Sequence, residues 1–217
     1  MCRISVLVAL AIFTACVLGC GGGSGTGGNS NSPFVNIQNT RLDPKSLTVK
    51  SGTIVQWTNL DSSPAQVVSG TLLATGNHNV IDTIDITLTG FSPVSSTANF
   101  GDTIQFNNIS GNPFSMEVLN ADGSQVVPTV DFLIGEQKTV TFPGAGLYIF
   151  RKSGSSIFQG TLILFGRPNP DGRFQSPTLA HGEVYRVQFD AVNSYSYYAP
   201  NLDNPDQSFR TGTVVVQ

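Results

Sequence analysis

Short apolar runs alternate with polar residues along most of the chain after residue 34. Stretches such as SLTVKSGTIVQWTN and TGTVVVQ place every second side chain on one face, which is the period of a half-buried β-strand. Gly, Pro, Asn and Asp, which favour turns, separate these runs. No window keeps the spacing of an amphipathic helix over a useful length. The pattern therefore predicts an all-β protein built as a sandwich or a barrel.

Two spaced patterns each occur twice in this part of the chain. The first joins Gly52, Trp57, Asn59 and Pro64 to Gly101, Phe106, Asn108 and Pro113, and the second joins Gly135, Phe142, Tyr148 and Phe150 to Gly182, Phe189, Tyr195 and Tyr197. The spacing is identical within each pair of sets. A Gly-Thr followed by an apolar strand closes each copy, at Gly160 and at Gly212. The chain therefore holds two copies of one sandwich-like unit.

The order of the half-patterns is front, front, back, back, whereas a tandem array would read front, back, front, back. This order predicts that a domain of residues 79–168 is inserted in an outer domain made of 34–78 plus 169–217. Such insertion is tolerated because the termini of a domain often lie close together at its surface. The alternative is one large irregular sandwich.

The first 19 residues have the layout of a secretory signal: Arg3, then an apolar stretch, then small residues. The sequence Val17-Leu18-Gly19-Cys20 resembles the lipobox of bacterial lipoproteins. The resemblance implies cleavage before Cys20 and attachment of lipid to its thiol, which would anchor the protein outside the cytoplasm, in the periplasm or on the cell surface. An uncleaved anchor helix and an ordinary signal are the alternatives. Residues 20–33 then form the predicted flexible Gly/Ser linker.

Composition and charge exclude several classes of function. Charged residues make up 12% of the chain, and the net charge of −3 provides no basic stripe for nucleic acid. All three cysteines, Cys2, Cys16 and Cys20, lie in the signal or at its end, so the mature domains have no disulfide and no thiolate. No G-x-S-x-G turn occurs, and acids such as Asp61 sit among turn residues. We predict that the protein is not an enzyme; an enzyme with an unrecognised site is the third alternative.

The repeated motifs resemble those of the cupredoxins, the blue-copper β-sandwich family. The front half is similar to the family pattern G-x-x-V-x-W-x-N-x-D-x-x-P-H-x-V, and joining 34–78 to 169–217 yields a nearly complete cupredoxin sequence. The resemblance implies two cupredoxin-like Greek-key sandwiches, the second inserted in the first. It also implies where copper would bind, because blue copper needs two His, one Cys and a weak axial Met.

The copper ligands are missing at the matching positions. In the outer copy these positions, for the first His, the Cys and the Met, hold Ala65, Ala199 and Arg210; in the inserted copy they hold Phe114, Lys152 and Phe158. The second His has no counterpart in either copy. We therefore expect no copper and no other cofactor. A copper-binding or electron-transfer protein is the alternative function.

His78 and His181 are the only histidines and offer a weak alternative metal site, with Asp82 or Asp171 as a further ligand. Two solvated loop histidines are the simpler expectation.

The loops at the ligand end form a candidate interaction surface, because aromatic and Arg side chains are enriched in protein interfaces. These side chains are Phe114, Phe158, Phe209 and Arg210. In the other interpretation they only fill the vacated metal pocket. The sequence thus predicts a lipid-anchored, non-enzymatic binding or structural module, with membrane lipid at Cys20 and another envelope protein or an unknown ligand as partners.

Overall fold

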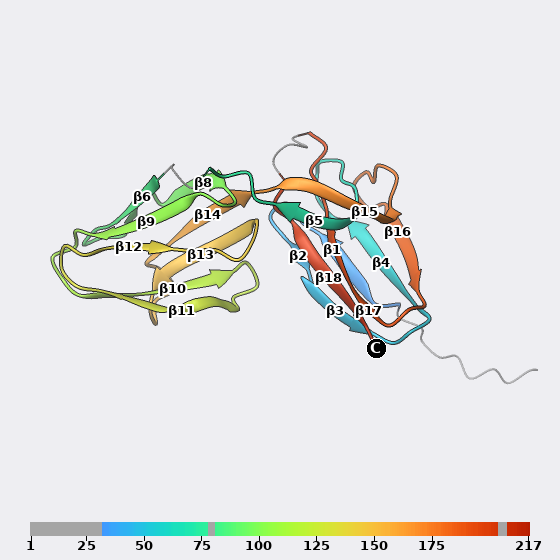
Figure 1. The fold of residues 1–217 in the computed structure, drawn as a ribbon, viewed down its shortest axis with the longest axis horizontal. Helices are drawn as coiled ribbons and strands as arrows, with labels where there is room; N and C mark the ends of the chain where they lie inside the picture. The colour runs from blue at the N-terminus through green and yellow to red at the C-terminus, as the bar shows by residue number, and fades with distance from the viewer. Residues whose placement is uncertain (1–31, 78–80, 204–207) are drawn as a thin grey trace, which may run out of the picture. The chain divides into compact units, whose positions relative to one another are not determined.

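The computed structural model describes residues 32–77, 81–203 and 208–217. The regular structure in these residues consists only of β-strands (Figure 1). Eighteen strands form four sheets. Within the same residues, no helix has the length and apolar character needed to span a membrane.

Two of the sheets form the outer sandwich. The first has the order β16-β4-β1-β2, with bounds Val184–Phe189, Thr53–Asn59, Phe34–Ile37 and Leu42–Asp43. The second has the order β15-β5-β17-β18-β3, with bounds Arg167–Gln175, Val68–Leu73, Asn193–Tyr198, Thr211–Val216 and Ser46–Val49. Each sheet therefore combines strands from both ends of the chain.

The other two sheets form the inserted sandwich from the middle of the chain. One has the order β11-β10-β13-β14-β8, with bounds Gln125–Phe132, Phe114–Asn120, Gly146–Lys152, Gln159–Phe165 and Ser95–Asn99. The other has the order β12-β9-β6-β7, with bounds Gln137–Val140, Thr103–Asn108, Ile81–Ile86 and Phe91–Ser92. The predicted fold class, an all-β chain with one sandwich inserted in another, is confirmed. The boundaries at 78/79 and 168/169 stay predictions, and β15 already begins at Arg167.

The two sandwiches pair their strands in the same way. In each, the first strand runs parallel to a long neighbour (β1 with β4, β6 with β9), and the last strand runs parallel to another (β18 with β3, β14 with β8). The remaining pairs are antiparallel and also correspond, for example β17 with β5 and β13 with β10. The two sequence repeats therefore mark equivalent positions in one strand scheme used twice.

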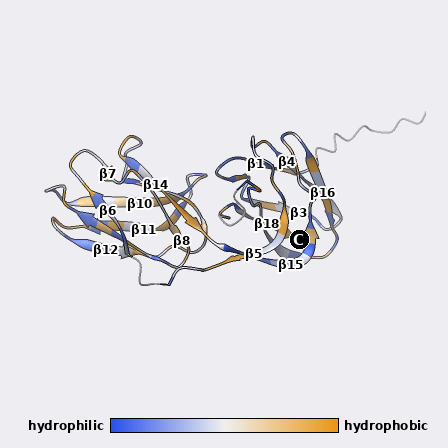
Figure 2. Ribbon diagram, turned by 90° about the horizontal axis from the view of Figure 1, so that it is seen from above, coloured by the Kyte–Doolittle hydropathy of each residue, from blue (hydrophilic) through white to orange (hydrophobic). Residues whose placement is uncertain are grey.

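Each sandwich has its own apolar core. Trp57 is fully buried in the outer core, where its ring meets that of Tyr197 edge-on at 5.3 Å. Phe106 holds the equivalent place in the inserted core and meets Phe150 at 5.3 Å. Hydrophobic and hydrophilic segments both occur along the strands (Figure 2), as expected for strands with one buried and one exposed face.

Two buried tyrosines make the fold sensitive to alkaline pH. Burial raises the pKa of Tyr148 and of Tyr197 to about 12. The stabilisation by the neutral phenols is complete below the unfolded-state pKa near 10, and we expect it to be lost as the pH rises from about 10 to about 12. The loss should reach roughly 2–3 kcal/mol for each tyrosine. Urea unfolding between neutral pH and pH 12 measures it, and the Tyr148→Phe and Tyr197→Phe variants should each flatten the profile; unchanged profiles would contradict the assignment.

Candidate functional site

The positions that match copper ligands lie at the same end of each sandwich, which we call its pole. In the outer sandwich the amide of Ala199 donates to the carbonyl of Arg210 at 2.9 Å. In the inserted sandwich the amide of Lys152 donates to the carbonyl of Phe158, also at 2.9 Å. The two pairs of positions that the sequence matches, one in each sandwich, therefore make the same backbone hydrogen bond.

At the outer pole, the two alanines are sealed inside the protein. Ala65 is fully buried, and Ala199 is 1% exposed. Backbone hydrogen bonds join Ala65 and Leu179 in both directions, at 3.1 and 2.8 Å, and Ala65 also bridges Asn201, two residues after Ala199. The structure thus brings together segments that are far apart in sequence, and it places both alanines in the apolar core.

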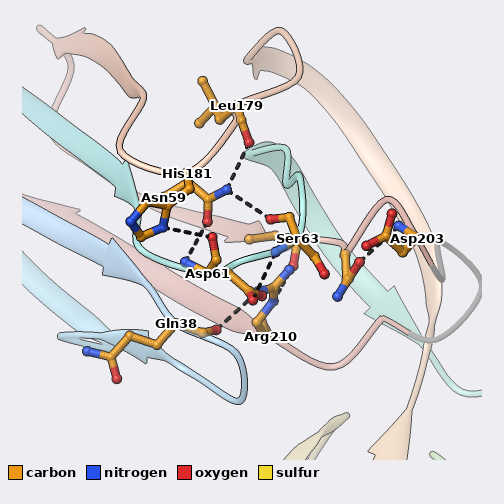
Figure 3. A network of polar contacts seen from close by, with 10 residues as sticks. Gln38, Asn59, Asp61, Ser63, Leu179, His181, Asp203 and Arg210 are labelled. Carbon is orange, nitrogen blue, oxygen red and sulfur yellow. Dashed lines mark hydrogen bonds and ion pairs between the residues drawn. The ribbon is translucent and has the colours of Figure 1, made fainter.

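A buried ion pair lies beside these alanines. Nη1 of Arg210 lies 2.8 Å from Oδ2 of Asp61, and the two side chains are only 2% and 3% exposed (Figure 3). The guanidinium also donates from Nε to the carbonyl of Ala199 at 2.8 Å and from Nη1 to the carbonyl of Gln38 at 3.0 Å. Burial lowers the pKa of Arg210, and the charge of Asp61 opposes this shift. A fixed cation therefore occupies the position that matches the axial Met.

Asn59 holds the Asp61 loop in place. Its Oδ1 accepts from the amide of Asp61 at 3.0 Å, and its Nδ2 donates to the carbonyls of Ser63 and Leu179 at 3.0 and 2.8 Å (Figure 3). Oδ1 of Asp61 accepts from the amide of Ser63 at 3.3 Å. Asp61 is therefore both the turn residue expected from the sequence and, through its other oxygen, the partner of Arg210.

The inserted sandwich keeps the asparagine but not the ion pair. Nδ2 of Asn108 donates to the carbonyls of Asn112 and Leu133 at 2.8 and 2.9 Å, and its Oδ1 accepts from the amide of Ser110 at 3.1 Å. Ser110 stands where the outer copy has Asp61. The scaffold of the pole is common to both copies, whereas the groups placed on it differ.

Replacing either asparagine should destabilise the protein to a similar extent. Asn59→Ala and Asn108→Ala each leave two carbonyls and one amide without their side-chain partner, so we expect a loss of about 2–3 kcal/mol in the free energy of unfolding. Urea titration of both variants tests this, with Asn193→Ala on an exposed strand position as the control, which should change it by less than about 0.5 kcal/mol. A loss confined to one asparagine would contradict a shared scaffold role.

At the inserted pole, aromatic rings fill the matching positions. Phe114 is 5% exposed and lies 5.3 Å from the ring of Phe158, and Phe91 contacts both rings at 5.7 and 5.3 Å. Lys152 points to solvent, next to the Arg151–Glu117 ion pair of 2.8 Å. The rings of Phe114 and Phe158 thus lie side by side, and Lys152 does not join them in the core.

The four side chains proposed as an interaction surface are largely enclosed. Phe114 and Arg210 are buried, while Phe158 and Phe209 are half-buried. This arrangement favours the interpretation that they fill the pole. The sequence did not reveal the partner of Arg210, because 149 residues separate it from Asp61. The N-x-D spacing at residues 59–61 was the sequence feature that could have drawn attention to Asp61.

The predicted histidine site is only half described. The ring of His181 is exposed, with its Nδ1 3.1 Å from the carbonyl of Asp61, whereas His78 lies outside the described residues. Cys20, the signal 1–19 and most of the linker also lie outside the described residues. Across residues 32–77, 81–203 and 208–217, no three His, Cys, Asp or Glu side chains group as a metal site would require. Whether the chain binds metal stays a prediction.

No family model matches this chain, and no curated protein matches it. Among solved structures it is similar to a reduced amicyanin variant, with 13% identity over 46% of this chain and 98% of amicyanin, at a TM-score of 0.33. It is also similar to auracyanin from Roseiflexus castenholzii, with 14% identity, 41% and 98% coverage and a TM-score of 0.32. A purple cupredoxin from Nitrosopumilus maritimus matches with 15% identity, 63% and 99% coverage and a TM-score of 0.19. The fold of the chain is cupredoxin-like, in two nested copies.

Proposed function

We propose that this protein is a lipid-anchored, extracytoplasmic binding or structural module without enzymatic activity, in which both cupredoxin-like poles have lost copper. The observation that carries the proposal is the Asp61–Arg210 pair, whose guanidinium is held by three contacts at the axial position. A copper ion placed there would meet a guanidinium that has no lone pair to donate and whose charge is already paired with Asp61, which opposes its binding. The inserted pole supports the same conclusion, because phenyl rings occupy its matching positions and cannot ligate copper.

Copper titration of the purified protein tests the loss of the metal site. We expect no intense absorption at about 600 nm and no rise in the melting temperature with added copper, because neither pole supplies a thiolate. The alternative function, a copper-binding or electron-transfer protein, is suggested by neighbours such as the Cu(I) form of an amicyanin variant. A saturable copper site with a strong visible band would establish that alternative.

Substitution of the cysteines tests the anchor. We expect Cys20→Ser to move the protein from the membrane fraction to the soluble fraction of the producing cells, because the lipid would lose its attachment point. Cys16→Ser is the matched control and should leave the protein in the membrane fraction. If the Cys20→Ser protein kept its first 19 residues and stayed in the membrane, those residues would act as an uncleaved anchor instead.

A further inference from the structure

Four loops at the pole of the inserted sandwich carry strongly exposed aliphatic side chains. The exposed fractions are 72% for Leu88, 55% for Ile109, 70% for Leu133, 63% for Ile134 and 94% for Ile157. They belong to the loops 87–90, 109–113, 133–136 and 153–158. We call these five side chains the aliphatic tips. Such a concentration of exposed apolar groups marks an interaction surface.

Strand directions place all four loops at one end of the inserted sandwich (Figure 1). β6 and β9 are parallel, so the loops that follow them leave from the same end. The amide of Ile109 donates to the carbonyl of Ile86, and the amide of Gly135 donates to the carbonyl of Asn108, at 2.9 Å each. These bonds connect the loop 133–136 to the loops 87–90 and 109–113. The amide of Ser153 donates to Ser115 at 2.8 Å and ties the fourth.

The outer sandwich shows that the strand scheme does not require these side chains. The positions equivalent to the aliphatic tips hold Asn39, Leu60, Ala180, His181 and Phe209. Of these five, only Leu60 is an exposed large aliphatic side chain, with 45% exposure, because the exposed Ala180 carries a single methyl group. The aliphatic tips are therefore a property of the inserted copy rather than of the scaffold.

The four loops carry almost no charge. Glu136 is their single ionisable side chain, and it is neutralised by Lys138 at 3.2 Å while it accepts from the amide of Leu133 at 2.7 Å. Loops without an unpaired charge can be transferred from water to an apolar environment without the cost of burying such a charge. The exposed groups also differ from a typical protein interface, in which Trp, Tyr and Arg dominate the binding energy and Leu is under-represented. Apolar tips on neutral loops fit a hydrocarbon surface better.

We propose that the aliphatic tips insert into the interfacial layer of a lipid bilayer, so that the inserted sandwich is a second, weak membrane contact. This inference rests on the proposed anchor at Cys20. The eleven residues 21–31 between Cys20 and the described chain span at most about 40 Å, which keeps the folded part close to the bilayer that holds the lipid. At the high effective concentration set by such a tether, a contact that is weak in solution becomes occupied.

Vesicle binding by a chain without the anchor tests this inference separately from lipidation. The chain from Gly21 to Gln217 lacks Cys20, and residues 32–217 form a compact unit of their own. Because the contact is weak without the tether, we expect it to sediment with phosphatidylcholine vesicles only at a high vesicle concentration, and to do so equally well in about 1 M salt, because the contact is apolar. Leu133→Ser with Ile134→Ser should lower the partition coefficient about tenfold, and Ile157→Ser about fivefold.

Val192→Ser is the matched control, because Val192 is 71% exposed but lies on a loop of the outer sandwich. It should bind vesicles like the unchanged chain, and unchanged circular dichroism of all variants shows that they fold. Absence of vesicle binding by the unchanged chain would overturn the inference and leave the anchor at Cys20 standing. Self-association that the same serine substitutions abolish, without vesicle binding, would also overturn it, because the aliphatic tips would then join two copies of the chain.

Discussion

Asp61→Ala is expected to lower the free energy of unfolding by about 3–5 kcal/mol, the cost of leaving one charge of a buried ion pair without its partner. The Arg210 guanidinium would remain enclosed, since its side chain is only 2% exposed and its other hydrogen bonds go to the carbonyls of Ala199 and Gln38. Urea unfolding followed by tryptophan fluorescence measures the loss, because the single tryptophan, Trp57, lies in the same core as the pole.

Two further variants separate charge burial from other effects. Asp61→Leu combined with Arg210→Met should recover most of the stability, because well-packed apolar groups often replace a buried ion pair without loss. Arg173→Ala removes an exposed pair, in which Nε of Arg173 lies 3.5 Å from Asp171, and should cost about 1 kcal/mol or less. If Asp61→Ala cost no more than Arg173→Ala, the pole would be open to water and the proposed barrier to copper would fall.

Phe114→Ala is expected to cost about 3–5 kcal/mol of unfolding free energy, because it removes a buried ring and leaves a cavity. The ring contacts those of Phe91 and Phe158 at 5.7 and 5.3 Å, so both neighbours would lose packing. Urea unfolding followed by circular dichroism measures the change, since the inserted sandwich contains no tryptophan.

Phe34→Ala is the control for this prediction, because Phe34 is 54% exposed and its loss should cost about 1 kcal/mol or less. A small effect of Phe114→Ala would mean that its ring is not needed for packing. The interpretation of this position as part of an interaction surface would then be favoured.

The interiors of the two poles are filled by different side chains. In each cupredoxin-like sandwich, loops enclose the pole, and protein interiors tolerate few voids. The inserted copy fills it with Phe114 and Phe158, whereas the outer copy fills it with an ion pair whose charges satisfy each other. In the outer copy, the pair also links the segments around Asp61, Gln38 and Ala199. The duplicated scaffold therefore tolerates very different groups at its pole.

The sequence by itself determined the all-β class, the presence of two copies and their nesting. Alternation of apolar and polar residues has a period that depends only on the strand, and the order of the half-patterns from Gly52 to Tyr197 is a property of the chain. The prediction that Ala65 and Ala199 stand at copper-ligand positions also comes from the sequence alone, because it depends only on residue type at matched positions.

Only the tertiary structure decided what occupies the poles and what remains on the surface. The Asp61–Arg210 pair joins residues on separate loops, and nothing in the local pattern of either residue specifies its partner. The exposure of Leu133 and Ile157 was also hidden, because an apolar residue in a loop can turn inward or outward at the same hydropathy. Local periodicity reports the geometry of the backbone, whereas burial and charge pairing depend on contacts between distant segments.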